Sequence, residues 1–168
     1  MRGSARPAAV RMARAQQERD VPRCRAPAPS KMRRRTVSPM GYEKINIDEL
    51  EDQAKPNGLT SQEARFPRKD LRAERIGLAH YKVNPGARLE FGHRHRSMEE
   101  VYVVLSGSGS FAVDDETLEV AAHDAVRVEP QSWRSWEAGP DGMELLAFGE
   151  HVEGDGESDL DMAWWPKD

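Results

Sequence analysis

The sequence predicts an all-β domain that folds as a small sandwich or barrel. Short runs of β-branched and aromatic residues follow one another at close, regular spacing, and turn residues separate them. The sequence contains no internal repeat of solenoid length and no apolar run long enough to cross a membrane. Its length of 168 residues suits one such domain with an extension at each end.

The elements follow in chain order from these runs. Residues 45–53 are predicted as a short helix or an extended arm, 52–68 as a polar loop, and 71–83 as the segment of the first strand. Further strands are expected at 88–95, 100–105, 110–113, 117–121, 125–128, 132–136 and 143–148. Turns are expected where Gly, Pro, Asp and Asn concentrate, at 84–86, 106–107, 114–115, 123–124 and 139–142.

The stretch that begins at His93 carries the strongest chemical signal. His93 and His95 are two positions apart, so on a strand both side chains point to one face. Two carboxylates, Glu99 and Glu100, follow, and then a run of β-branched and aromatic residues. Two imidazoles and a carboxylate from adjacent strands are a ligand set for a divalent transition metal. A strand histidine is more often a core or surface residue, so spacing alone leaves a metal site and a structural role about equally open.

These residues resemble the first sequence motif of the cupin superfamily. The matching positions are Pro85-Gly86, His93-x-His95, Glu100 and Gly107. The resemblance covers about residues 71–150, and it implies a small cupin-like β-barrel, the double-stranded β-helix or jelly roll. It also implies that His93, His95 and Glu100 bind a divalent metal (Fe, Mn, Zn or Ni). Members of the family often pair through their sheets, so a homodimer is implied as well.

The second motif of the superfamily differs at a decisive position. The place of its last histidine ligand falls on Arg134, or on Ser135 if the register slips by one residue. Arginine offers only donors and stays protonated, so it cannot ligate a cation. One outcome is a metal held by two histidines and Glu100, with open coordination positions. The other is a metal-free pocket in which Arg134 replaces the ligand and pairs with Glu100.

A barrel of this size has room inside for one small ligand. We expect Phe91, Arg134 and Trp136 to contact a small polar molecule such as a sugar or an organic acid. Resemblance to cupins implies isomerase, epimerase or dioxygenase-like chemistry, in which Tyr102 or Glu99 would move protons. A non-catalytic binding or sensor module is the alternative. For each aromatic residue alone, a place in the core is the commoner outcome.

The chain divides by composition into four segments. Residues 1–39 carry 11 basic and 2 acidic residues and 5 prolines, which predicts a disordered basic tail or a native start at Met40. Residues 40–70 are interpreted as an N-terminal arm and 71–150 as the barrel. Residues 151–168 form an acidic tail in which Trp164-Trp165 are expected to anchor on the domain.

Charge and cysteine content limit the expected partners and compartment. Beyond residue 39 the chain holds 14 basic and 27 acidic residues, which argues against nucleic acid as a partner of the domain. Only the basic tail, with Arg33-Arg34-Arg35, suits nucleic acid or anionic lipid. Cys24 is the one cysteine, so no intramolecular disulfide can form. A cytoplasmic protein without membrane association is expected.

Overall fold

The computed structural model describes residues 41–155 and 159–165. The predicted tail at 1–39, with Cys24 and the alternative start at Met40, lies outside the described residues. Within the described part of the chain, no helix has both the length and the apolar character that a membrane span requires.

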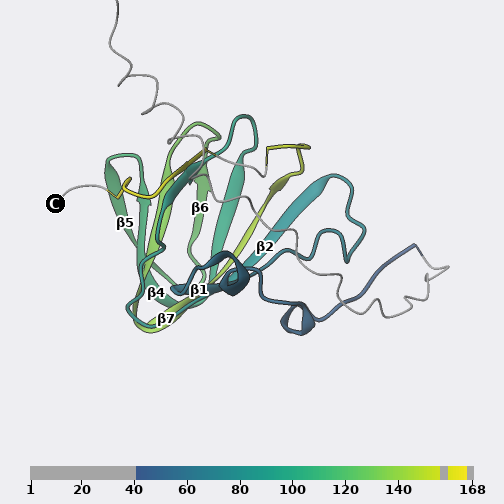
Figure 1. Cartoon of the computed structure of the whole chain (residues 1–168), viewed down its shortest axis with the longest axis horizontal. Helices are drawn as coiled ribbons and strands as arrows, with labels where there is room; N and C mark the ends of the chain where they lie inside the picture. Colours follow the sequence, from purple (N-terminus) through teal and green to yellow (C-terminus); the bar gives the residue numbers. More distant parts are fainter. Residues whose placement is uncertain (1–40, 156–158, 166–168) are drawn as a thin grey trace, which may run out of the picture. The chain divides into compact units, whose positions relative to one another are not determined.

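Strands make up nearly all the regular structure of the described residues, which confirms the all-β prediction. They are β1 (Gln62–Arg65), β2 (Ile76–Val83), β3 (Gly92–Arg94), β4 (Glu100–Val113), β5 (Glu116–Ala121), β6 (Ala125–Val128), β7 (Arg134–Glu150) and β8 (Asp159–Asp161). All of them pair antiparallel within one curled sheet (Figure 1). Two single-turn 3-10 helices, Ile47–Glu49 and Lys55–Asn57, lie in the segment predicted as an arm.

The two long strands, β4 and β7, join the halves of this sheet. The first half of β4 lies between β6 and β7, and its second half lies between β5 and β7. The C-terminal half of β7 pairs with β2, while its first residue, Arg134, pairs with His93 of β3. Each long strand therefore contributes side chains to both halves of the barrel interior.

Two segments predicted as turns are instead irregularities inside these long strands. β4 continues through Ser106 and Gly107, and its register against β7 shifts on either side of that pair. The residues 139–142 lie within β7, and the pairing with β4 skips them. Unpaired residues bend a strand and increase its twist. The glycine-rich composition that indicated turns therefore marks the points where β4 and β7 bend.

Two short edge strands lie where no strand was predicted. β1 lies in the stretch predicted as a polar loop and pairs with β2, and β8 lies in the acidic tail and pairs with β3. Their sequences, QEAR and DLD, have little of the β-branched or aromatic character on which strand prediction depends. The first predicted strand is shorter than expected, because the chain becomes extended only at Ile76.

The core fills the barrel with one inward-facing set of side chains, and aromatic rings dominate its centre. Trp136, Tyr102 and Phe111 are each 1% exposed. Their ring centroids lie 4.9–5.8 Å apart, which is the range of favourable aromatic contact. The remaining buried members are Ala79, Val83, Leu89, Val104, Val120, Val128, Ala138, Met143, Leu145 and Ala147. One end of this core borders the two histidines of β3 and the segment after it.

Candidate metal and ligand site

His93 and His95 lie side by side inside the barrel. Main-chain pairing holds both: His93 pairs with Arg134, and the His95 N–H donates to the carbonyl of Pro130 over 2.9 Å. Both side chains are buried, and the two rings meet edge to face with centroids 5.6 Å apart. The two-residue spacing thus places both imidazoles on one face, as strand geometry requires.

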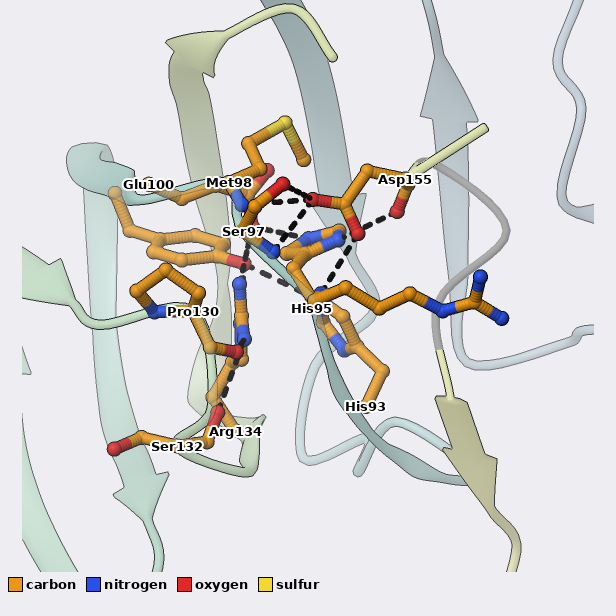
Figure 2. A network of polar contacts seen from close by, with 11 residues as sticks. His93, His95, Ser97, Met98, Glu100, Pro130, Ser132, Arg134 and Asp155 are labelled. Carbon is orange, nitrogen blue, oxygen red and sulfur yellow. Dashed lines mark hydrogen bonds and ion pairs between the residues drawn. The ribbon is translucent and has the colours of Figure 1, made fainter. Parts of the chain in front are cut away.

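Glu100, the first residue of β4, completes a group with the two histidines. One potential ligand atom from each of the three residues lies within 4.8 Å of the other two. Figure 2 shows the three side chains converging from β3, the segment that follows it, and β4. This group could bind a metal ion, because two imidazoles and one carboxylate leave coordination positions open for a ligand.

One oxygen of the Glu100 carboxylate collects most of the polar contacts in the site. Oε2 lies 2.9 Å from His95 Nε2, accepts the Tyr102 hydroxyl over 2.5 Å, and accepts Arg134 Nη2 over 3.0 Å. The other oxygen, Oε1, makes no hydrogen bond with the described residues. Glu100 therefore keeps one oxygen for a further partner while the other is fixed by the protein.

Arg134 is fully buried at the start of β7 and is held on several sides. Its Nη1 donates to the carbonyls of Pro130 and Ser132 over 3.2 and 3.0 Å, and its Nε donates to the Tyr102 hydroxyl over 3.3 Å. The pair with Glu100 completes the set, so the guanidinium points into the site and not to solvent (Figure 2). A buried charge is tolerated only with such partners.

The protonation states of the site suit metal ligation. Burial acts to raise the pKa of Glu100, but the hydrogen bond and charge of His95, the Tyr102 hydroxyl and the charge of Arg134 outweigh it and lower the pKa to about 2. Burial and the nearby Arg134 charge lower the pKa of His93 to about 3. At neutral pH the carboxylate is ionised and the His93 ring is neutral, as metal ligands must be.

Both ring nitrogens of His95 face acceptors. Nδ1 lies 2.9 Å from the main-chain carbonyl of Asp155, and a carbonyl can only accept, so Nδ1 carries a proton. Nε2 then faces the Glu100 carboxylate, which is also an acceptor when ionised. A second ring proton would make this contact a hydrogen bond, whereas a metal bound by both groups would lie beside the line that joins them and replace that proton. The donor set therefore fits a metal at this position.

The two ring nitrogens of His93 lie in different surroundings. Its Nε2 lies 3.3 Å from the Tyr102 hydroxyl. Its Nδ1 is buried and, among the described residues, has no hydrogen-bond partner.

The barrel and its histidine pair match a known family. Residues 79–148 match the family model described as a cupin domain. This domain belongs to the cupin superfamily. No curated protein matches the sequence significantly.

Solved structures of other cupins share the fold. A cupin protein from Bacteroides fragilis is 23% identical, with a TM-score of 0.54 over 68% of this chain and 87% of that one. A sugar phosphate isomerase of the cupin superfamily from Silicibacter pomeroyi is 13% identical, with a TM-score of 0.57 over 66% and 76%. A variant of oxalate decarboxylase from Bacillus subtilis is 18% identical, with a TM-score of 0.57 over 70% of this chain. The match spans only 31% of that decarboxylase. At these identities the likeness concerns the fold alone.

The other residues predicted for this cupin site lie in different surroundings. Phe91 is half-buried, and its ring meets that of His93 edge to face at 6.0 Å. Trp136 lies in the core, and its Nε1 donates to the side chain of Gln62 over 2.9 Å. Glu99 is not brought into the group, because its exposed carboxylate pairs with Arg127 on the outer side of the sheet.

Tyr102 lies at the centre of the cupin site, with its hydroxyl between Glu100, His93 and Arg134. Burial and the charge of Glu100 raise its pKa well above the usual value. The hydroxyl therefore keeps its proton at neutral pH and donates it to the Glu100 carboxylate as a hydrogen bond.

Asp155 is a site residue that sequence reasoning missed. Its carboxylate accepts the main-chain N–H groups of Arg96, Ser97 and Met98 over 2.7, 2.8 and 2.7 Å, and the Ser97 hydroxyl over 2.9 Å. Burial acts to raise the pKa of Asp155, but these hydrogen bonds lower it to about 2. Asp155 lies beyond the matched cupin domain in an acidic stretch, and its sequence context does not distinguish it from its acidic neighbours.

Proposed function

We propose that this cupin domain binds one divalent transition metal through His93, His95 and Glu100 and holds a small polar ligand beside it. The convergence of the three ligand atoms carries the proposal. Their charge states support it, because the site contains an ionised carboxylate and a neutral imidazole at neutral pH. Iron, manganese, zinc or nickel would act there as a Lewis acid toward the ligand.

The chain's own residues define what the ligand would meet. Tyr102 offers a hydroxyl that keeps its proton. Arg134 adds a fixed positive charge directly behind Tyr102 and Glu100, with which it forms hydrogen bonds. Oxygen-rich molecules such as sugars or organic acids suit donors of this kind. Isomerase, epimerase and dioxygenase-like reactions are all compatible with the fold, and the fold by itself does not select one.

A second candidate function rests on the Arg134–Glu100 pair. Their 3.0 Å contact places the buried guanidinium of Arg134 beside the Glu100 carboxylate. The guanidinium could therefore supply the positive charge that a metal would otherwise supply. In this version the domain is a metal-free binding or sensor cupin, and Arg134 takes over the electrostatic role of the missing histidine ligand.

A thermal-shift titration separates the two candidates. A metal that binds only the folded protein raises the melting temperature by mass action. We expect Mn²⁺, Zn²⁺, Ni²⁺ or Fe²⁺ to raise it for the wild type and a chelator to reverse the effect. His95→Ala should abolish the shift.

His80→Ala is the matched control, because His80 is a buried strand histidine that pairs with Glu144 outside the group. It should keep the shift. A wild type that responds to none of these metals favours the metal-free candidate.

A further inference from the structure

The segment that follows the matched cupin domain reaches back to the candidate metal site. The main-chain carbonyl of Asp155 lies 2.9 Å from Nδ1 of His95. The Asp155 carboxylate meanwhile takes three consecutive N–H groups of the loop that links His95 to Glu100. Asp155 thus contacts the His95 ring directly and also fixes the chain between His95 and Glu100, two of the potential metal ligands (Figure 2).

The strand β8 and the residues after it hold the neighbouring part of the site. Leu160 pairs with His93, which places β8 along the free edge of β3. The ring of Trp164 lies against Gly92, where a Cβ atom would overlap it, and Trp165 Nε1 donates to the Leu89 carbonyl over 2.9 Å. The described C-terminal residues therefore border both histidines.

The contact of Asp155 with His95 has a chemical consequence for the ring. A carbonyl at Nδ1 requires the proton on that nitrogen, so Nε2 is the nitrogen that faces Glu100 and that a metal would use once any second proton is displaced. Partners of this kind set the tautomer and orientation of metal-binding histidines. Apart from one main-chain hydrogen bond, from the Asp155 N–H to the carbonyl of Val152 over 3.2 Å, the carboxylate contacts with the 96–98 loop are what hold Asp155 at this place.

We propose that Asp155 is a positioning residue of the metal site, and that the C-terminal segment is a working part of that site and not an accessory tail. The proposal rests on the proposed metal binding by His93, His95 and Glu100. In this account Asp155 contacts neither the metal nor the small polar molecule bound beside it. It acts by holding His95 in the tautomer that can ligate.

Asp52 offers a matched control elsewhere in the chain. Its carboxylate also accepts three main-chain N–H groups, those of Ala54, Lys55 and Ala64, over 2.9, 3.3 and 2.9 Å. None of these residues belongs to the metal-ligand group. Asp155→Ala and Asp52→Ala therefore remove the same kind of clamp, one at the site and one away from it.

The first measurement is metal affinity by competition with a chelating dye, at a temperature where both variants are folded. Loss of an outer hydrogen-bond partner typically weakens metal binding about 10–100-fold. We expect a loss of that size for Asp155→Ala and wild-type affinity for Asp52→Ala. Equal affinity in the two variants would overturn the role of Asp155 while leaving the metal site itself intact.

The second measurement uses the metal-free protein, so it remains informative if the wild type binds no metal. NMR correlation of the ring nitrogens with the ring protons reports the tautomer of each histidine. The His95 Nδ1–H state should be fixed in the wild type and in Asp52→Ala, and it should be lost in Asp155→Ala. An unchanged His95 ring in Asp155→Ala would refute the proposal. If either alanine variant does not fold, the Asp155→Asn and Asp52→Asn pair replaces it.

Discussion

At the scale of single residues, the site depends on how one carboxylate is shared. Oε2 of Glu100 meets an imidazole, a phenol and a guanidinium, and Oε1 stays available. Arg134, one of the two positions where the family motif predicts a histidine, pairs with the same carboxylate that a metal would need. Its charge offsets that of Glu100 inside the barrel.

Removing Arg134 tests this arrangement. Arg134→Ala removes a cationic partner from a buried carboxylate, and breaking such a pair typically costs about 3–5 kcal/mol of unfolding free energy. The double variant Arg134→Ala with Glu100→Gln should recover much of that loss in urea denaturation, because the unpaired charge is gone. A single variant as stable as the wild type would show that Arg134 does not stabilise the site.

Replacing the arginine with the histidine that the family motif contains tests the same position from the other side. Arg134→His supplies a neutral imidazole where the fourth ligand is expected, so metal affinity should increase relative to the wild type. A chelator competition titration measures the change. Unchanged or weaker binding would mean that the side chain at 134 does not reach the metal position.

The stability of the fold should fall in acid because of Asp155. Its folded-state pKa of about 2 lies below the unfolded value of 3.8, so its contribution is complete above about pH 4 and is lost as the pH falls toward 2. We expect the unfolding free energy of the wild type to decrease over this range. Asp155→Asn should be less stable near pH 6 and should show a smaller decrease on acidification. Parallel curves for the two proteins would exclude Asp155 as a source of acid sensitivity.

At the scale of elements, the glycine positions in the two long strands decide how the sheet closes. Gly107 has φ of +77°, and a Cβ atom there would collide with the main-chain carbonyl of Gly142. The two bends of β4 and β7 therefore lie in direct contact. Neither bend could be distinguished from a chain-reversing turn by composition, because both structures use glycine for the same backbone reason.

A pair of alanine substitutions separates the free-energy cost of a positive φ from the cost of crowding between the two bends. Gly86 also has a positive φ, +65°, but open space surrounds the position of its missing Cβ. Gly86→Ala should cost about 1–2 kcal/mol, the usual price of a left-handed alanine. Gly107→Ala should cost clearly more in chemical denaturation, since the main chain must also move. Equal costs would show that the contact between the bends relaxes easily.

Local sequence predicted the elements that depend on the pattern of side chains. It did not predict the elements that depend on main-chain contacts between distant residues. The alternation around His93 and His95 and the strand that starts at Glu100 follow from strand periodicity. β8 joins β3 through its backbone, and Asp155 reaches the site through contacts with residues 57–60 positions away. Such contacts leave no periodic signal in a single sequence.

At the scale of the whole molecule, the outer face of the sheet carries a row of apolar side chains. Leu78, Phe148 and Val101 lie in register across β2, β7 and β4, and Phe148 is 38% exposed. Side chains that face outward on a strand with two apolar faces require cover. We propose that a second copy of the chain supplies it, in line with the homodimer that the cupin resemblance implies.

Light scattering coupled to gel filtration tests the homodimer. The wild type should elute at twice the chain mass, and Phe148→Asp should shift the population to monomer by placing a charge in the apolar row. Leu118→Asp is the control, because Leu118 is 39% exposed but lies on β5, outside that row. A monomeric wild type at micromolar concentration would contradict the proposal.

The most direct test of the central claim is the metal content of tag-free protein after loading and removal of excess metal. Mass spectrometry of the acid-digested sample should find close to one atom of iron, manganese, zinc or nickel per chain in the wild type. The Glu100→Gln and His95→Ala variants should lose it, while His80→Ala should keep it. A wild type with no bound metal after loading, or metal retained in His95→Ala, would contradict a site formed by His93, His95 and Glu100.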